Sequence, residues 1–195
     1  MKNVALSLLI FLTSCNVAEQ LAGAYGMTQC KYSYNSIANL SLAGVNLQNA
    51  SSLSSLNPLA AANLLAAFGT SQGNLPLQFT LNLDIANPGS QQAILNELGY
   101  ILEVDGIELT QGSSSSRLQI DGGKKAVLPV NLAFDLKKVM SGQSLSAMKK
   151  LAFNFAGIGD EASNVTMKLQ PSLLVGGKTY KSPSYIPVSF TLNRK

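Results

Sequence analysis

The chain has 195 residues, of which 46% are apolar and 12% are charged, and it contains no histidine. So many apolar and so few charged residues exclude an intrinsically disordered chain, and the lack of histidine excludes Ser-His-Asp, Cys-His and the usual zinc sites. The formal net charge is +4, and the lysines come as pairs without interleaved aromatic residues, which argues against a nucleic-acid partner.

The first fourteen residues have the layout of a secretory signal. Lys2 gives a positive start, residues 4–12 are an apolar run, and Thr13 and Ser14 are small residues before Cys15. A helix that spans a bilayer needs about 20 residues. The pattern therefore predicts a cleaved peptide rather than a transmembrane segment.

The ending Leu12-Thr13-Ser14-Cys15 resembles the bacterial lipobox, in which an apolar residue and two small residues precede the cysteine that is acylated. The resemblance implies a lipoprotein signal peptide over residues 1–14 and a mature chain that begins at lipid-modified Cys15. Two or three acyl chains hold a protein permanently on a membrane. We therefore expect a protein anchored in the bacterial cell envelope.

The state of Cys15 decides what Cys30 can do. If the sulfur of Cys15 is acylated, Cys30 is the remaining thiol of an exported chain and forms no intramolecular disulfide. We then expect Cys30 to be a passive, half-buried thiol. The alternatives are a reactive thiol or an intermolecular disulfide. The alternative for the anchor is an ordinary signal peptide cut nearby, with Cys15 a free thiol or bridged to Cys30. Asn16, where an aspartate is the familiar inner-membrane signal, favours the periplasmic face of the outer membrane.

Charge is uneven along the chain. Residues 15–116 hold one basic and six acidic residues, a net charge of −5, whereas residues 117–195 hold twelve basic and four acidic residues, a net charge of +8. A basic second half favours an anionic surface as a partner. If strands from the two halves interleave, however, the charges mix in space.

The first predicted β segment covers residues 31–47. Its apolar residues stand at even positions at Leu40 and Leu42 and at odd positions from Val45, so their parity changes after Leu42. We predict a β-bulge near Ala43-Gly44 that accounts for this change.

A helix is predicted over residues 58–68, in the sequence NPLAAANLLAAFG. Asn57 is a suitable N-cap, Pro58 suits the first helical position, and Gly69 can end the helix.

The central part of the chain predicts a long strand and a hairpin. The sequence LQFTLNLDIANPG alternates from Leu77 and ends at Asn87-Pro88. In GYILEVDGIELTQG, the pair Asp105-Gly106 predicts a tight turn. Between them, residues 90–98 suit either a capped helical turn or the start of a strand.

Further alternation predicts strands at 117–121, 127–134, 165–169 and 186–192. Ser144 is predicted to cap a second helix in SGQSLSAMKKLAFNF, after a possible turn at residues 136–140. Strands outnumber helices, so we expect a mainly β fold: one antiparallel β-sandwich with one or two short α-helices.

These central segments, taken together, resemble the LEA14-type domain (late embryogenesis abundant group 2, or WHy). The resemblance rests on the strand that ends in Asn87-Pro88, the apolar segment with Tyr100, and the hairpin with Gly106 and Gly112. Further matching residues are Leu81, Leu83, Ile85, Leu95, Leu98 and Leu102.

The resemblance spans residues 75–192 and implies a fibronectin-III or immunoglobulin-like sandwich associated with desiccation and general stress. In that family Asn87, Pro88, Tyr100, Gly106 and Gly112 would define the fold, and no catalytic residue is implied. We expect a lipidated tether over residues 15–30 and a single domain over residues 31–195.

One catalytic pattern needs weighing, the S-x-x-K spacing of Ser146 and Lys149, with Lys178-Thr179 downstream. Tyr180 replaces the glycine of the K-T-G strand found in penicillin-binding enzymes, and chance supplies about one such spacing in a chain this rich in serine and lysine. We therefore expect no enzyme, and no metal or other cofactor.

The leading hypothesis is a non-enzymatic, lipid-anchored envelope protein that acts as a structural or interaction module, with a role in stress tolerance. Its expected partners are the membrane and an envelope protein or anionic surface. The alternative is a module that binds a ligand or peptide, in a groove beside the helix at residues 58–68 or at an open strand edge.

Overall fold

The computed structural model describes residues 23, 25–70, 73–115, 117–159, 161–175 and 178–192. Its strands are β1 (Lys31–Leu42), β2 (Val45–Asn46), β3 (Pro76–Ala86), β4 (Ala93–Leu95), β5 (Glu97–Val104), β6 (Ile107–Ser114), β7 (Leu118–Ile120), β8 (Lys125–Asp135), β9 (Ser163–Val175), β10 (Lys178–Lys181) and β11 (Ile186–Leu192). Its helices are the 3-10 helix η1 (Leu53–Ser55) and the α-helices α2 (Pro58–Gly69), α3 (Leu136–Val139) and α4 (Leu145–Ala156). The predicted signal peptide and the predicted lipid attachment at Cys15 lie outside these described residues.

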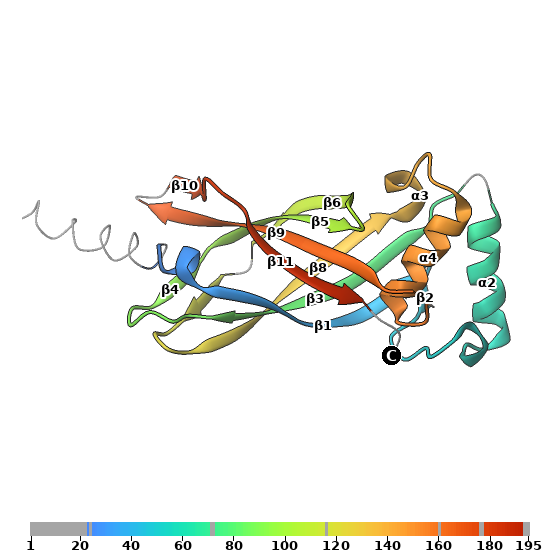
Figure 1. Ribbon diagram of the computed structural model, residues 1–195, viewed down its shortest axis with the longest axis horizontal. Coiled ribbons are helices and arrows are strands. Elements are labelled where there is room, and N and C mark those ends of the chain that lie inside the picture. Colours follow the sequence, from blue (N-terminus) through green and yellow to red (C-terminus); the bar gives the residue numbers. More distant parts are fainter. Residues whose placement is uncertain are drawn as a thin grey trace, which may run out of the picture.

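Two antiparallel sheets form the layers of the molecule (Figure 1). One sheet has the order β2-β1-β3-β8; the other has the order β6-β5-β9, with both β10 and β11 paired to the free side of β9. Strands β4 and β7 form a separate short pair, so the ambiguous segment before β5 is a strand. The predicted mainly β, antiparallel sandwich with short helices is confirmed.

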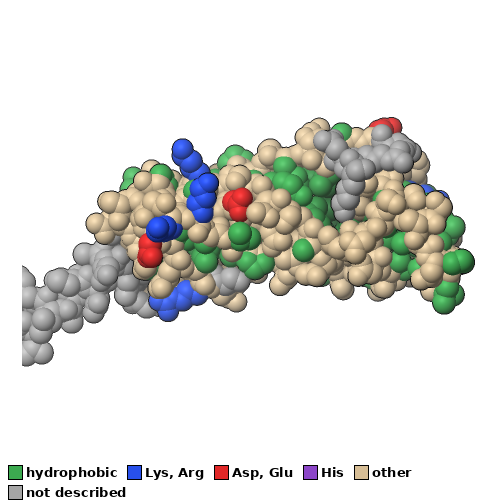
Figure 2. Space-filling model, turned by 90° about the horizontal axis from the view of Figure 1, so that it is seen from below, with side chains coloured by type: hydrophobic (Ala, Val, Ile, Leu, Met, Phe, Trp, Pro, Cys, Tyr) green, Lys and Arg blue, Asp and Glu red, His purple; other side chains and the backbone are tan. Residues whose placement is uncertain are grey.

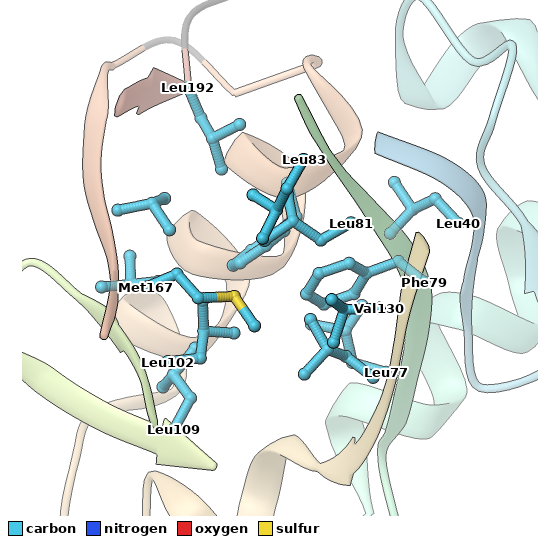
Figure 3. Packing of buried hydrophobic residues seen from close by; sticks show 14 of the residues in the cluster. Leu40, Leu77, Phe79, Leu81, Leu83, Leu102, Leu109, Val130, Met167 and Leu192 are labelled. Carbon is cyan, nitrogen blue, oxygen red and sulfur yellow. The ribbon is translucent and has the colours of Figure 1, made fainter. Parts of the chain in front are cut away.

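The core lies between the two sheets. Alternate residues of β3 are buried, as predicted from the sequence, and they face residues such as Leu102 of β5 and Met167 of β9 (Figure 3). The buried β3 residues are Leu77, Phe79, Leu81, Leu83 and Ile85. Each such side chain contributes about 1.5–3 kcal/mol to stability when it leaves water. The buried face of β3 is therefore a large part of the contact between the two sheets.

The predicted bulge at Ala43-Gly44 is wrong. These two residues form the turn of a hairpin in which Leu42 pairs with Val45, and both have positive φ angles, 50° and 78°. A two-residue turn of this kind suits the twist of the strands it joins, and it changes the parity as a bulge would. The irregular pairing of β1 with β3 occurs earlier, between Tyr34 and Ser36 and between Ala38 and Ser41.

The predicted turn at Asp105-Gly106 is present, with positive φ at both residues, and joins β5 to β6. Within this hairpin Tyr100 pairs with Gly112. The Tyr100 hydroxyl oxygen lies 2.7 Å from the position that a Cβ on residue 112 would occupy, which is too close for a side chain there. Gly112 therefore makes room for the tyrosine ring across the strands.

The helices begin as predicted and end differently. Asn57 and Ser144 cap α2 and α4 by accepting from the backbone N–H of Ala60 and Ala147. Gly157 ends α4 in the left-handed conformation. Helix α2, in contrast, includes Gly69 as its last residue, and its C-cap is Thr70, which has a negative φ angle.

The two ends of the sandwich differ, and Figure 1 shows them at opposite ends of the long axis. At the lysine end, β1 begins at Lys31, β3 ends at Ala86 and β8 begins at Lys125. At the helix end lie α2, α3 and α4. The packed structure extends before Lys31, because residues 25–29 are helical and Met27 is fully buried at the lysine end.

Two edge strands carry prolines. Among the described residues, β8 pairs with β3 alone and β11 with β9 alone, and they contain Pro129 and Pro187. A proline has no N–H to offer an incoming strand. The described part of the chain contains no helix long and apolar enough to cross a membrane.

Candidate functional site: a groove beside helix α2

A groove of about 530 Å³ lies beside the first half of α2. It is bounded by the β1–β2 turn on one side and by η1 and α2 on the other. Its lining residues are Gly44, Val45, Asn46, Asn49, Ala50, Ser55, Leu56, Asn57, Leu59, Ala60 and Asn63. The groove is therefore beside the helix that the sequence predicted at residues 58–68.

The groove is uncharged, and its lining mixes aliphatic side chains with asparagines and a serine. Val45, Leu56 and Leu59 supply aliphatic side chains, and no charged residue occurs between Lys31 and Asp84 in the sequence. Within the described structure, the side-chain amides of Asn49 and Asn63 are exposed and have no hydrogen-bond partner. Amides can pair with both the N–H and the C=O groups of a peptide backbone.

Helix α2 is held on the sandwich by one face. Leu64 and Phe68 are its buried residues, and the Phe68 ring meets the Phe153 ring of α4 edge to face, with centroids 5.8 Å apart. Lys149 lies over the same Phe68 ring, with its Nζ 5.7 Å from the centroid. These contacts fix the second half of α2 and leave the first half beside the groove.

Lys137 closes the C-terminal end of α2. Its ammonium group donates to the carbonyl oxygens of Ala67, at 2.8 Å, and Thr70, at 2.5 Å. Unpaired carbonyls at a helix C-terminus carry partial negative charge, which a cation stabilises. The sequence did not reveal this role because about 70 residues separate the lysine from the helix it caps.

The opposite face of α2 is open. Leu59 and Leu65 are 70% and 51% exposed, and Ala62 and Ala66 are also exposed between them. A helix that is apolar all round is normally buried. Helix α2 therefore presents an exposed apolar surface beside an uncharged groove, and exposed apolar surface of this kind is typical of an interaction site.

Asn87 organises the lysine end. It is 3% exposed, and its Nδ2 donates to the carbonyls of Gln91 and Ile120, at 2.8 and 2.9 Å, while its Oδ1 accepts from the N–H of Gly89. A buried amide with all these bonds fixes loops rather than reacts. Pro88 beside it is exposed.

The loops around Asn87 are closely packed. The Asn87 backbone N–H donates to Lys124 O and its carbonyl accepts from Gly123 N–H. A Cβ on Gly122 would lie 2.4 Å from Ser90 O, so only glycine fits there. The sequence segments around residues 87–90 and 121–124 are thus locked together.

Ser146 and Lys149 do not form a catalytic pair. Ser146 is exposed, and no hydrogen bond joins it to Lys149, whose ammonium lies over Phe68 instead. Activation of the serine requires hydrogen-bond contact with its base. Among the described residues there is also no group of three or more Cys, Asp or Glu side chains that could hold a metal ion.

Cys30 is a buried free thiol. Burial raises the pKa of the Cys30 thiol, which keeps it protonated and weakly nucleophilic. Burial also raises the pKa of the nearby Tyr32 hydroxyl, and the charge that Cys30 would carry when ionised raises it further. This hydroxyl donates to Met27 O at 2.8 Å. The thiol is more deeply buried than the half-buried position expected from the sequence, and its environment is that of an inert residue.

No family model and no curated protein matches the chain. Solved structures with a similar arrangement include one of a protein provisionally assigned to the late embryogenesis abundant (LEA) proteins, at 14% identity and TM-score 0.40, covering 97% of this chain and 82% of that one.

Two others are a protein from Archaeoglobus fulgidus, at 11% identity and TM-score 0.38, covering 65% of this chain and 91% of that one, and a protein from Arabidopsis thaliana, also at 11% identity and TM-score 0.38, covering 59% and 67%. Likenesses of this size carry no functional argument.

Proposed function

We propose that this protein is a non-catalytic, lipid-anchored interaction module of the bacterial envelope, which binds an apolar, uncharged peptide segment of a partner protein in the groove beside α2. The observation that carries the proposal is the groove itself. It combines aliphatic walls with two unpartnered amides, Asn49 and Asn63, and contains no charge.

An apolar peptide fits this chemistry because its side chains bury against Leu56 and Leu59 while its backbone pairs with the amides. A charged segment would lose its hydration without gaining an opposite charge. Binding by addition of a strand is less favoured at β8 and β11, because these edge strands contain Pro129 and Pro187.

The anchor in this proposal is Cys15, supported by the lipobox-like sequence that precedes it. It is tested by intact mass and detergent partitioning of the protein made in a bacterium, beside Cys15→Ser. A wild-type mass that begins at residue 15 with added acyl chains supports the anchor, and an unmodified Cys15 rejects it. We also propose that the module serves stress tolerance, as the LEA14-type resemblance implies.

The groove is tested by selecting peptides from a displayed random library on the Cys15→Ser protein. Selected peptides should be apolar and uncharged, and Leu59→Glu should weaken their binding by at least tenfold because it places a charge in the groove wall. Leu65→Glu is the matched control, since Leu65 is exposed on the same helix but does not line the groove. Equal effects of the two variants, or selection of charged peptides, would reject the groove as the binding site.

A further inference from the structure

The lysine end has a second concave surface, unrelated to the α2 groove. A hollow of about 580 Å³ lies over the outer face of the first sheet, where Lys31, Lys124 and Lys125 line it together with Asp84. Its other lining residues are Tyr32, Ser33, Ala86, Asn87, Pro88 and Gly123. Basic side chains from two segments distant in sequence, Lys31 and Lys124-Lys125, thus surround one hollow.

Strand register explains why these lysines converge. Lys31 of β1 pairs with Ala86 of β3, which pairs with Lys125 of β8. Directly paired residues point to the same face of a sheet, and strands separated by one neighbour are about 10 Å apart. Two lysine side chains therefore flank a small alanine, and the alanine leaves the space between their ammonium groups open.

The lysines are not neutralised by the protein. In the described ranges, the salt bridges join Lys150 to Glu161 and Lys168 to Glu103, and none involves the lysines of the hollow. Asp84 lines the same hollow and accepts from the uncharged Asn35 Nδ2, so it keeps its charge, and three lysines and one carboxylate give the hollow a net charge of +2. Asp121 accepts from Gln92 Nε2. Figure 2 shows basic side chains gathered toward one end of the molecule.

The position of the hollow points to a membrane. It lies at the end where the described chain begins. Seven residues lie between Cys15 and Gly23, and the eight steps from one to the other reach at most about 28 Å when extended. Tyr25, at this same end, is 66% exposed, and tyrosine is enriched at membrane–water interfaces. An acylated Cys15 would hold this end, rather than the helix end, against the lipid surface.

We propose that Lys31, Lys124 and Lys125 bind the phosphate groups of anionic phospholipids, so that the lysine end lies on the membrane and the α2 groove points away from it. This orientation rests on the proposed anchor, whereas binding to anionic lipid is a property of the folded domain. A phosphate between Lys31 and Lys125 receives two charge-assisted hydrogen bonds.

The test measures co-sedimentation of the full chain carrying Cys15→Ser with vesicles of phosphatidylcholine, and with vesicles that also contain phosphatidylglycerol. This chain has no acyl group, so the result does not depend on whether Cys15 is lipidated. The apolar segment at residues 4–12 is present in every variant and is accounted for by the neutral vesicles. We expect a preference for phosphatidylglycerol that high salt abolishes.

The decisive variant is Lys124→Glu with Lys125→Glu. Each lysine near an anionic surface contributes about a factor of five to partitioning, so the double variant should bind phosphatidylglycerol vesicles about 30-fold more weakly. The control, Lys138→Glu with Lys149→Glu, makes the same change of charge at the helix end and should have a much smaller effect. No preference for anionic vesicles, or equal losses in the two double variants, would overturn the proposal.

A second measurement requires no substitution in the hollow. Acetylation of lysines on the vesicle-bound Cys15→Ser chain, read by mass spectrometry, should be reduced at Lys31, Lys124 and Lys125 relative to Lys138 when phosphatidylglycerol is present. Uniform acetylation of all four on those vesicles would reject contact through this end.

Discussion

The lysine end and the helix end of this sandwich are stabilised in different ways. At the lysine end, loops are tied together by the buried amide of Asn87 and by the close approach of Gly122 to Ser90. At the helix end, α2 is attached by apolar side chains, above all Leu64 and Phe68. The first end is thus held by directional hydrogen bonds, whereas apolar packing on one face of α2 leaves the second end with an exposed apolar surface.

The largest effect is expected at the lysine end. Asn87→Ala removes three side-chain hydrogen bonds and leaves the buried carbonyl of Ile120 and the partly buried backbone groups of Gln91 and Gly89 without them, which costs on the order of 4 kcal/mol. Chemical unfolding checks this value. Asn63→Ala, at an exposed amide without a partner, is the control and should change stability by less than about 0.5 kcal/mol. Similar values for the two variants would show that Asn87 does not hold the loops.

At the helix end, two adjacent leucines should contribute very differently to the stability of the protein. Leu64 is fully buried under α2 and Leu65 is 51% exposed. Leu64→Ala should destabilise the protein by about 3 kcal/mol, and Leu65→Ala by less than about 0.5 kcal/mol. Thermal unfolding of both variants measures the difference. Equal losses would mean that both faces of α2 are packed.

The ends of helix α2 should contribute less than its buried face. Asn57→Ala removes the side-chain acceptor of the Ala60 N–H, and Lys137→Met removes the ammonium that closes the other end. Each should cost about 1 kcal/mol. Hydrogen exchange across α2 should increase in both variants while exchange in β3 stays unchanged. Faster exchange in β3 as well would indicate global rather than local loosening.

The smallest effect concerns pH. Burial holds the pKa of the folded Cys30 thiol above its ordinary value of 9.0, so the unfolded chain loses this proton first as the pH rises. Stability from this group is fully present below about pH 9 and is lost as the pH rises through the folded pKa. Melting temperatures from pH 7 to 11 should therefore fall more steeply for wild type than for Cys30→Ala. Parallel curves would show that the thiol is not desolvated.

Much of the fold was predictable because its signals are local. The alternation in β3 and the turn at Asp105-Gly106 require only neighbours in sequence, and both are present. The change of parity at Ala43-Gly44 was ambiguous, because a bulge and a two-residue turn both produce it. Ala43 has a φ angle of 50°, which is unusual for a residue with a Cβ.

The features that were missed depend on contacts distant in sequence. The cap that Lys137 provides for α2 is one example. Charge is another: β8 begins at the lysine end and finishes at the helix end, so Lys124 and Lys125 are separated in space from Lys138 and Lys149. The basic second half of the sequence therefore does not become a single basic face, and the lysines of the hollow include Lys31 from the first half.

The prolines of the edge strands have a consequence for crowding. A chain confined to a membrane surface would meet copies of itself far more often than one free in solution, and exposed strand edges would then join copies into fibres. Pro129 and Pro187 interrupt the row of donors along β8 and β11. The two prolines thus limit stacking along β8 and β11, whereas β6, which among the described residues pairs with β5 alone, is an edge strand without proline.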